Sequence, residues 1–396
     1  MDITIQPKRL QGDITVIPSK SQAHRLLICA AFADGPTILN CPETNRDMDA
    51  TAGCLNALGA DITKTETGYF VTPAGKTPEK AELNVHDSGS TLRFMLPVAG
   101  ALGVDTLFQM EGRLPQRPLS PMWEEMERMG CSLTRPTDDT IRCTGKLRPG
   151  HYRIDGSVSS QYITGLLLAL SLLDCPSQLE ITGQVESRPY IQMTKDAVSR
   201  FGADPEKPGS KRFHSPGNLT VEGDWSNGAF FLAANTLGSK LDIHGLKADS
   251  SQGDRATAVL LPKLREGRQV IDARDIPDLV PILSVVAACC HGAEFTNIRR
   301  LRLKESDRVA SVIAMITALG GRAEADENTL CVFGTGLNGG TVESVNDHRI
   351  AMSAAIAATV CEEQVTILGA DCVQKSYPRF FEEYRRLGGN YEQHLR

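Results

Sequence analysis

Residues 303–308 read Leu-Lys-Glu-Ser-Asp-Arg, so four of the six positions are charged. The apolar residues that follow recur at helical spacing: Val309, Val312, Ile313, Ile316 and Leu319. A Gly-Gly pair at 320–321 predicts the end of this helix. The stretch therefore predicts a charged corner that leads into an amphipathic helix.

Ser306 or Asp307 is the expected N-cap of this helix. Because the N-terminus of a helix carries positive partial charge, Lys304 and Arg308 would repel both the dipole and each other unless an anion lies between them. A solvated helix start is the alternative for a single stretch of this kind. Similar polar clusters elsewhere in the chain favour the interpretation that these cations bind an anion.

Length, composition and net charge limit the classes of protein to which this sequence can belong. A chain of 396 residues favours two domains, and 41% hydrophobic with 23% charged residues is typical of a globular protein. The net charge of −6 argues against a nucleic-acid-binding protein, which would normally be basic. Anions would have to bind at local Arg and Lys clusters.

No targeting or membrane segment is predicted. The N-terminus lacks a basic segment followed by an apolar run, and the longest apolar runs are too short to span a bilayer. The eleven cysteines include no CxxC pair, which argues against a metal site or a disulfide framework. Cys289 and Cys290 are expected in the core of an apolar helix. We therefore expect a cytoplasmic protein.

The opening stretch belongs to one of six similar units. Each unit has a polar cluster, an apolar helix, a β-rich segment, a second helix that ends near a glycine, and a further strand. The apolar helices start near residues 21, 90, 160, 226, 278 and 348, at intervals of 66 to 70 residues except for one interval of 52. This repeat predicts βαβαββ modules and an α/β (α+β) fold of two similar domains with three modules each.

The fourth unit is the shortest. A strand pair is expected to be missing after Gly267, and Pro262 is expected to interrupt the second helix of this unit.

The polar segment 221–224 lies between the third and fourth units and is the natural linker. The first strand, around Ile3 and Ile5, precedes the first unit and is expected to pair with the second domain. These features predict one domain at 15–222 and another formed by 1–14 plus 223–396. A hinge is expected near 10–18 and 221–224.

Polar residues at the N-termini of the apolar helices are candidates for anion binding, because unpaired N–H groups point outward there. No Walker or dinucleotide-binding glycine motif stands between a strand and a helix. Lys20 with Ser21 could be an ordinary helix start, and Arg113 and Arg117 in their loop could be solvated. Their joint occurrence at repeat-equivalent positions predicts a shared anion site.

Together these segments resemble the 5-enolpyruvylshikimate-3-phosphate synthase family of enolpyruvyl transferases. The segments that carry the resemblance are 18–21, 113–118, 155–161, 187–190, 276–278, 301–308, 346–349 and Lys375. They run in order along essentially the whole chain. The resemblance implies two domains of three βαβαββ units each, an inside-out α/β barrel, with the active site in the interdomain cleft.

The resemblance also implies the reaction. The enolpyruvyl group of phosphoenolpyruvate would be transferred to the 5-hydroxyl of shikimate 3-phosphate, with release of phosphate, in the shikimate pathway toward chorismate and the aromatic amino acids. It implies no metal and no organic cofactor. The partners would be the two small substrates, with no nucleic acid and no membrane, and the chain would be a monomer.

The resemblance assigns site residues position by position. Shikimate 3-phosphate would be bound by Lys20, Ser21, Arg25, Ser159, Ser160, Gln161, Ser187, Tyr190, Asp278, Arg300 and Lys304. Phosphoenolpyruvate would be bound by Lys20, Ser88, Ser90, Arg117, Gln161, Arg308, Arg349 and Lys375. This choice of residues is physically reasonable, because a guanidinium pairs with planar carboxylate and phosphate groups through two hydrogen bonds.

The chemistry needs a base for the 5-hydroxyl, an acid for the methylene carbon of phosphoenolpyruvate, and cations at the leaving phosphate. The resemblance assigns the base to Asp278. It assigns the proton transfer at the methylene carbon to Glu305 with Lys20.

Two positions depart from the family pattern. Residues 88–91 read Ser-Gly-Ser-Thr where familiar members have Asn-Ala-Gly-Thr, so Ser90 replaces a glycine that lies against phosphoenolpyruvate. The added hydroxymethyl group is expected to crowd the longer inhibitor glyphosate and so to reduce sensitivity to it. Arg300 replaces a common asparagine and could still donate to an anion.

Two alternatives remain at this stage. A UDP-N-acetylglucosamine enolpyruvyl transferase shares the fold, but it is marked by Lys-Asn at the first site and usually by a loop cysteine. Here the first site is Lys20-Ser21, and the loop from Glu111 to Pro121 has no cysteine. A non-catalytic anion-binding relative would lack the base or the acid, whereas Asp278 and Glu305 are both present.

Overall fold

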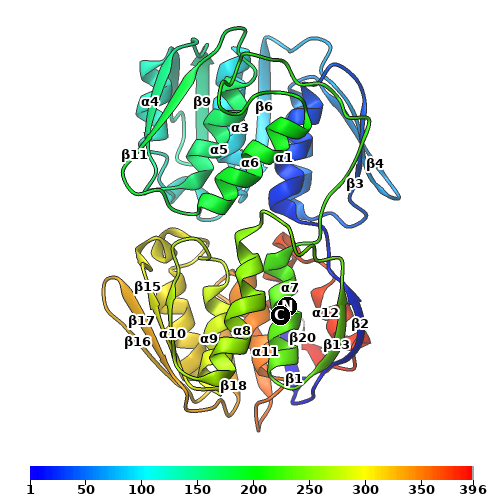
Figure 1. The fold of residues 1–396 in the computed structure, drawn as a ribbon, viewed down its shortest axis with the longest axis vertical. Helices are drawn as coiled ribbons and strands as arrows, with labels where there is room; N and C mark the ends of the chain where they lie inside the picture. Colours follow the sequence, from blue (N-terminus) through cyan, green and yellow to red (C-terminus); the bar gives the residue numbers. More distant parts are fainter. Residues whose placement is uncertain (395–396) are drawn as a thin grey trace. The chain divides into compact units, whose positions relative to one another are not determined.

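The computed structural model describes residues 1–394, which form two compact units. The inserted unit is Pro18–Glu222, and the outer unit combines Met1–Ile17 with the chain from Gly223 onward. Both units mix helices and strands in repeated order (Figure 1). None of the described helices combines the length and hydrophobicity needed to cross a bilayer.

The inserted unit contains six α-helices within the described chain. They are α1 (Lys20–Ala31), α2 (Arg46–Ala57), α3 (Gly89–Leu102), α4 (Met122–Arg128), α5 (Ser160–Leu170) and α6 (Arg188–Arg200), with the short turn η1 (Leu114–Gln116). Helices α1, α3 and α5 are almost wholly buried; α3 and α5 are mainly apolar, whereas the first half of α1 is polar and includes the buried residues Gln22, His24 and Arg25. Helix α6 packs against α1 and α5.

The strands of the inserted unit form three sheets within residues 18–222. One has the order β12 (Asn218–Thr220), β3 (Thr37–Asn40), β5 (Gly68–Thr72) and β4 (Asp61–Thr65). Another has the order β6 (Lys80–His86), β7 (Asp105–Met110), β9 (Thr140–Gly145) and β8 (Cys131–Thr134), and the third pairs β10 (His151–Asp155) with β11 (Gln178–Thr182). The strands flank the helices on both sides in Figure 1.

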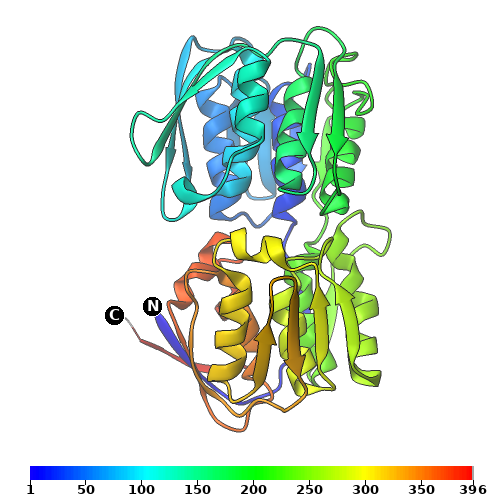
Figure 2. The ribbon, with the colours of Figure 1, turned by 90° about the vertical axis from the view of Figure 1, so that its left-hand side faces the viewer.

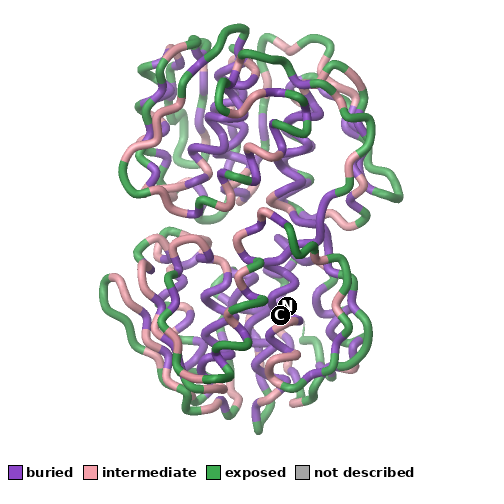
Figure 3. Tube along the Cα trace, in the orientation of Figure 1, coloured by how far each residue is buried: buried purple, intermediate pink, exposed green. Residues whose placement is uncertain are grey.

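The outer unit repeats this plan. Its helices are α7 (Trp225–Thr236), α8 (Thr257–Glu266), α9 (Val280–Cys289), α10 (Arg308–Ala318), α11 (His348–Ala357) and α12 (Phe380–Arg386). Short turns precede or join them: η2 (Gly253–Ala256), η3 (Arg299–Leu303) and η4 (Ala370–Lys375). The apolar helices α7, α9 and α11 contact one another and form the buried centre, coloured purple in Figure 3.

The outer unit also has three sheets over its described residues. The first has the order β14 (Gln269–Asp272), β15 (Ala293–Thr296), β17 (Thr329–Phe333) and β16 (Arg322–Ala325), and it lies in front of the helices in Figure 2. The second pairs β13 (Lys240–His244) with β2 (Gln11–Thr15). The third has the order β18 (Gly340–Glu343), β19 (Val365–Leu368), β1 (Asp2–Gln6) and β20 (Asn390–His394).

The first strand occupies an interior place in this third sheet. Strand β1 pairs antiparallel with both β19 and β20, so Ile3 stands opposite Ile367 and Ile5 opposite Val365. The side chains of Ile3 and Ile5 are fully buried in the core of the outer unit. The prediction that this strand pairs with the C-terminal part of the chain is confirmed.

The strand content of the repeats varies. Hairpins follow α2, α4 and α10, whereas α8 is followed before α9 by the single strand β14. The predicted loss of a strand pair after Gly267 is therefore confirmed. In the third unit the turns at 202–217 take the place of the hairpin, and only β12 follows α6.

Two expectations were wrong. Pro262 does not interrupt its helix, because α8 runs from Thr257 to Glu266 through it, at the cost of one backbone donor. Cys289 and Cys290 are not core residues: Cys289 ends α9, Cys290 is its C-cap, and both are partly exposed. Helix α9 ends at Cys289, so the two cysteines lie at its C-terminus and not within it.

We predict that Ile5→Ala destabilises the protein by about 3 kcal/mol, the usual cost of emptying a buried aliphatic site. The Ile5 side chain is buried in the core, and its strand is held on both sides by β19 and β20, so the cavity cannot close by a local shift of the strand. Urea denaturation measures the loss. Gln6→Ala, at an exposed position of the same strand, is the matched control. An equal effect of both changes would contradict a structural role for β1.

Candidate active site

The inserted unit gathers polar residues at the N-termini of its buried helices. Lys20 is the first residue of α1, and its Nζ lies 3.0 Å from Oδ2 of Asp47, which is buried in the first turn of α2. This ion pair holds the Lys20 ammonium beside the helix start. Asp47 was not predicted, because nothing in the sequence distinguishes it from an ordinary first-turn carboxylate.

Arg25 lies one turn into α1 and is 2% exposed. Its guanidinium donates to the hydroxyls of Thr194 (2.8 Å) and Thr164 (3.1 Å) and to the backbone oxygens of Ser21 (2.5 Å) and Tyr190 (3.0 Å). Burial lowers the pKa of Arg25 to about 10. Arg25 therefore links the N-terminal turns of α1 and α6 through a backbone oxygen of each helix. Its hydrogen bonds occupy most of its N–H donors.

A second contact joins α3 to α5. The side-chain amide of Gln161 donates to Oγ of Ser90 (3.0 Å), and its oxygen accepts from Nη1 of Arg93 (3.0 Å). Arg93 is buried, donates also to the backbone oxygen of Pro118 (3.1 Å), and lies over the ring of Tyr162. The structure thus brings the predicted residues Ser90 and Gln161 together and adds a cation.

Two guanidinium groups converge above Gly89. A Cβ on this residue would lie 2.6 Å from Nη1 of Arg117 and 2.7 Å from Nη1 of Arg93. Like charges this close favour an anion between them. Sequence analysis predicted Arg117 but missed Arg93. An arginine inside an otherwise apolar helix was the available signal.

The remaining predicted residues of the inserted unit lie at helix starts. Ser88 caps α3 by accepting from Thr91 N (3.3 Å), and Ser159 caps α5 by accepting from Gln161 N (3.2 Å). Ser160 is buried in the first turn of α5. Ser187 precedes α6 in the left-handed region, with φ of +54°, a strained position for a non-glycine residue.

In the outer unit, one guanidinium holds three carboxylates. Arg308, the first residue of α10, is 1% exposed. Its Nε lies 2.9 Å from Asp347 Oδ2, its Nη1 2.6 Å from Asp278 Oδ1, and its Nη2 2.7 Å from Glu305 Oε2. Burial lowers the pKa of Arg308, but Asp347, Glu305 and Asp278 outweigh it and raise the pKa above its usual range. Arg308 stays charged.

Asp278 is surrounded by cations. Besides Arg308, its carboxylate lies 3.2 Å from Nη2 of Arg349 and 3.7 Å from Nζ of Lys304. Burial raises the pKa of Asp278, but Arg349, Lys304 and Arg308 together outweigh it and hold the pKa well below its usual range. Asp278 is therefore an ionised carboxylate at neutral pH.

The N-cap prediction is resolved in favour of Asp307, whose Oδ1 accepts from the backbone N–H groups of Val309 and Ala310 (both 3.1 Å). Ser306, the other candidate, does not cap the helix. Its hydroxyl donates instead to Asp347 Oδ2 (3.0 Å), because the turn directs it toward α11. Asp347 in turn caps α11 by accepting from Arg349 N (3.0 Å).

The other predicted cations of the outer unit have different surroundings. Lys304 follows η3, and burial, with Arg308 and Arg300 nearby, lowers its pKa to about 8 despite Asp278. Arg300 lies within η3, and Lys375 ends η4 as a buried residue. Lys304, Arg308 and Arg349 thus lie near Asp278, and Arg300 lies near Lys304. Asp347 is the residue that sequence analysis did not assign.

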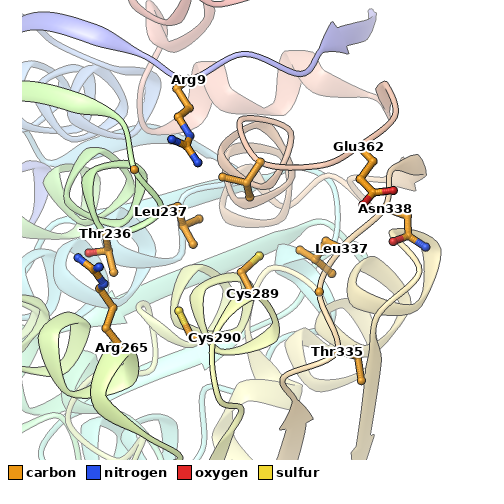
Figure 4. Close-up of a pocket in the computed structure, with 13 residues that line it drawn as sticks. Arg9, Thr236, Leu237, Arg265, Cys289, Cys290, Thr335, Leu337, Asn338 and Glu362 are labelled. Atoms are coloured by element: carbon orange, nitrogen blue, oxygen red, sulfur yellow. The ribbon is translucent and has the colours of Figure 1, made fainter.

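The outer unit also has a cavity of about 520 Å³, which contains none of the predicted site residues (Figure 4). It lies at the C-terminal ends of α7, α8 and α9, next to Leu237, Arg265 and Cys289. Arg9 and Arg265 project into this region, where cations complement the negative ends of helices. The cavity is at the opposite ends of the helices from the polar clusters.

The polar residues of the inserted unit and those of the outer unit form two sets, which supply groups suited to anion binding and proton transfer. Each has several cations at helix N-termini, and the outer unit adds an ionised carboxylate and a neighbouring Glu305. Among residues 1–394, no cluster of three or more His, Cys, Asp or Glu side chains has the arrangement of a metal site.

Comparison with known proteins identifies the family. The model of the family described as EPSP synthase (3-phosphoshikimate 1-carboxyvinyltransferase) matches residues 5–270 and 262–384. A 3-phosphoshikimate 1-carboxyvinyltransferase of Clostridium kluyveri is 36% identical over 99% of this chain and 98% of its own length. One from Clostridioides difficile is 35% identical over 99% and 98%.

Solved structures agree in fold. An EPSP synthase from Acinetobacter baumannii superimposes with a TM-score of 0.78 at 22% identity, covering 99% of this chain and 100% of that one. The enolpyruvyl transferase NikO from Streptomyces tendae gives 0.77 at 18% identity, covering 99% and 98%. The relatives' names do not favour the UDP-N-acetylglucosamine alternative, and the resemblance drawn from the sequence motifs is confirmed. The chain belongs to the EPSP synthase family.

Proposed function

We propose a role for individual side chains in each step of the reaction of this family. As a member of it, the chain transfers the enolpyruvyl group of phosphoenolpyruvate to the 5-hydroxyl of shikimate 3-phosphate and releases phosphate, a step of aromatic amino acid biosynthesis. The observation that supports our assignment most directly is the carboxylate of Asp278 among three cations. Both sets of polar residues act on the same pair of substrates.

Shikimate 3-phosphate is bound mainly by hydroxyl and cationic groups at helix starts. The phosphate is the natural ligand of Ser159, Ser160, Ser187 and Lys304, because serine donors and an ammonium suit a dianion. Lys20 and Ser21 bind the same substrate, with Gln161, Tyr190, Asp278 and Arg300. Arg25 supports this site indirectly: it donates hydrogen bonds to the backbone oxygens of Ser21 and Tyr190 and contributes its buried charge.

Phosphoenolpyruvate is bound by guanidinium groups. Arg117 and Arg93 converge above Gly89 and form one anion site, next to Ser88, Ser90 and Gln161. Arg308, Arg349 and Lys375, together with Lys20, form the other. Carboxylate and phosphate are planar or multidentate acceptors, which suits this choice of cations.

Substrate binding exchanges the carboxylates that pair with Arg308 for a substrate anion. In this structure Asp278 and Glu305 occupy two of its nitrogens. An incoming substrate anion competes for the same donors and displaces a carboxylate from its ion pair. The displaced group regains proton affinity because a nearby cation no longer stabilises its charge.

The chemistry follows from this arrangement. Asp278 accepts the proton of the 5-hydroxyl while the oxygen attacks C2 of phosphoenolpyruvate. Glu305, with Lys20, delivers a proton to the methylene carbon and takes one back when phosphate leaves. The guanidinium groups stabilise the charge of the leaving phosphate. We further propose that the protein is cytoplasmic and has no nucleic-acid partner, in keeping with its composition and net charge, and that it is a monomer.

We predict that Asp278→Asn lowers kcat by a factor on the order of 10² to 10⁴, the usual contribution of a positioned base. Phosphate release from phosphoenolpyruvate is measured with shikimate 3-phosphate and, in parallel, with UDP-N-acetylglucosamine. Asp275→Asn, on the same loop, is the control. Full activity of Asp278→Asn would remove Asp278 as the base, and activity with the sugar nucleotide alone would overturn the substrate assignment.

We predict that KM for shikimate 3-phosphate rises above about pH 8, because the pKa of Lys304 is lowered to about 8. Below this pH the ammonium is charged and pairs with the phosphate, and above it the charge is lost. Lys304→Arg keeps its charge, so its KM should stay level between pH 7 and about 9.5. Steady-state kinetics across this range test the idea, and parallel curves for both proteins would contradict it.

We predict that Ser90→Gly lowers the glyphosate concentration for half-inhibition by about tenfold, with little change in KM for phosphoenolpyruvate. Glycine removes the hydroxymethyl group that crowds the longer inhibitor. Ser90→Ala keeps Cβ and separates crowding from the hydrogen bond to Gln161. Inhibition of the unmodified enzyme at micromolar glyphosate, with ordinary affinity for phosphoenolpyruvate, would contradict the hypothesis.

A further inference from the structure

A buried hydrogen-bond network joins three helices of the inserted unit, and the assignment above does not use it. His24 lies on α1, Thr51 on α2, and Thr91 in the first turn of α3. Nδ1 of His24 lies 2.7 Å from Oγ1 of Thr51, which in turn lies 2.8 Å from Oγ1 of Thr91. Each of these residues is at most 1% exposed. Directional contacts therefore tie helices that otherwise pack through apolar side chains.

The network ends at the N-terminus of α3. Oγ1 of Thr91 donates to Oγ of Ser88 (2.9 Å), which is the N-cap of this helix. The next residue is Gly89, where a Cβ would lie 2.6 Å from Nη1 of Arg117 and 2.7 Å from Nη1 of Arg93. Both guanidinium groups thus lie directly against the backbone here. A small displacement of this turn would change the geometry of the anion site.

The hydrogen bonds of the network run in one direction. Oγ1 of Thr91 donates to Ser88 and lies 3.3 Å from the backbone oxygen of Asp47, which can only accept. Thr91 therefore accepts from Thr51, and Thr51 accepts from the Nδ1–H group of His24. Nε2 of His24 is buried without a hydrogen-bond partner among residues 1–394, which likewise favours Nδ1 as the site of the single ring proton.

The imidazole of His24 is a neutral donor. Burial lowers the pKa of His24 to about 3, and Asp47 opposes this shift. Lys20 and Arg25 add to it. The ring of His24 also meets the ring of Phe94, on α3, with the centroids 6.0 Å apart and the planes at 86°. His24 therefore contacts α3 both through the network and through this ring, and it brings no charge of its own.

We propose that His24 is a positioning residue for phosphoenolpyruvate. Through Thr51 and Thr91 it fixes the start of α3, and so the position of the Gly89 backbone against the two guanidinium groups. The inference rests on the proposed role of Arg117 in binding phosphoenolpyruvate. His24 acts from within the core and transfers no proton in the reaction.

The test removes one hydroxyl group of the network and keeps its shape. Valine at position 51 is close in size to threonine but cannot bond to His24 or Thr91, so Thr51→Val breaks the network. We expect KM for phosphoenolpyruvate to rise about fivefold to twentyfold, because the start of α3 is no longer fixed. KM for shikimate 3-phosphate should change less than about twofold, because its proposed serine ligands lie at the starts of α5 and α6.

Two variants are the controls. Thr51→Ser keeps the hydroxyl group, so its KM for phosphoenolpyruvate should stay within about twofold of the unmodified value. Thr106→Val removes another buried threonine hydroxyl of the same unit, one that donates to the backbone oxygen of Cys143 (3.5 Å). It should leave both KM values unchanged.

Thermal stability separates positioning from a merely structural role. Thr51→Val alone leaves the N–H group of His24 buried without an acceptor, so Tm should fall by about 3 to 6 °C. The double variant His24→Leu, Thr51→Val replaces both partners by apolar side chains and should recover most of this loss. It should nevertheless keep the raised KM for phosphoenolpyruvate, because the tie to Thr91 is still absent.

A KM that returns to the unmodified value together with Tm in the double variant would overturn the proposal. Should Thr51→Val not fold, the double variant provides the test by itself, with the same expected rise in KM.

Arg117→Ala distinguishes a failure of this inference from a failure of the proposed function. If Arg117→Ala leaves KM for phosphoenolpyruvate unchanged, the anion site is wrongly assigned and this inference is wrong with it. If Arg117→Ala raises that KM while Thr51→Val and the double variant leave it unchanged, only the role of His24 is wrong.

Discussion

The contact of Arg308 with three carboxylates is the interaction on which the outer unit's candidate site depends. A guanidinium that is 1% exposed is costly to bury unless anions surround it. Asp347 pairs with it and caps α11, Glu305 precedes it on the same turn, and Asp278 reaches it from the loop before α9. This single charge therefore fixes three segments that are far apart in the sequence.

The same principle explains why cations gather at helix starts without driving those helices apart. In each set, carboxylates or backbone oxygens offset the cations before any substrate arrives: Asp47 for Lys20, and the oxygens of Ser21 and Tyr190 for Arg25. Under the proposed assignment, a substrate anion replaces an existing partner of these cations. Substrate binding is then an exchange of ion-pair partners, which favours ligands with a matching number of charges.

The repeat, the helix ends and the pairing of the first strand could be predicted because they are local or periodic. Gly320 stops α10 with φ of +85°, as the Gly-Gly pair at 320–321 predicted. The convergence of Arg93 and Arg117 on Gly89 depends on contacts between distant segments. Ser306 illustrates the limit: capping rules suit it, but its partner Asp347 lies 41 positions away.

Strand β1 lies between β19 and β20, near the two ends of the chain. During synthesis, β1 is made before the inserted unit Pro18–Glu222, whereas its partners β19 and β20 are made well after it. The inserted unit, in contrast, holds its own core and has all its strand partners within its own segment. The inserted unit can therefore fold as soon as it has left the ribosome, while the first strand of the outer unit stays unpaired until β19 and β20 have been made.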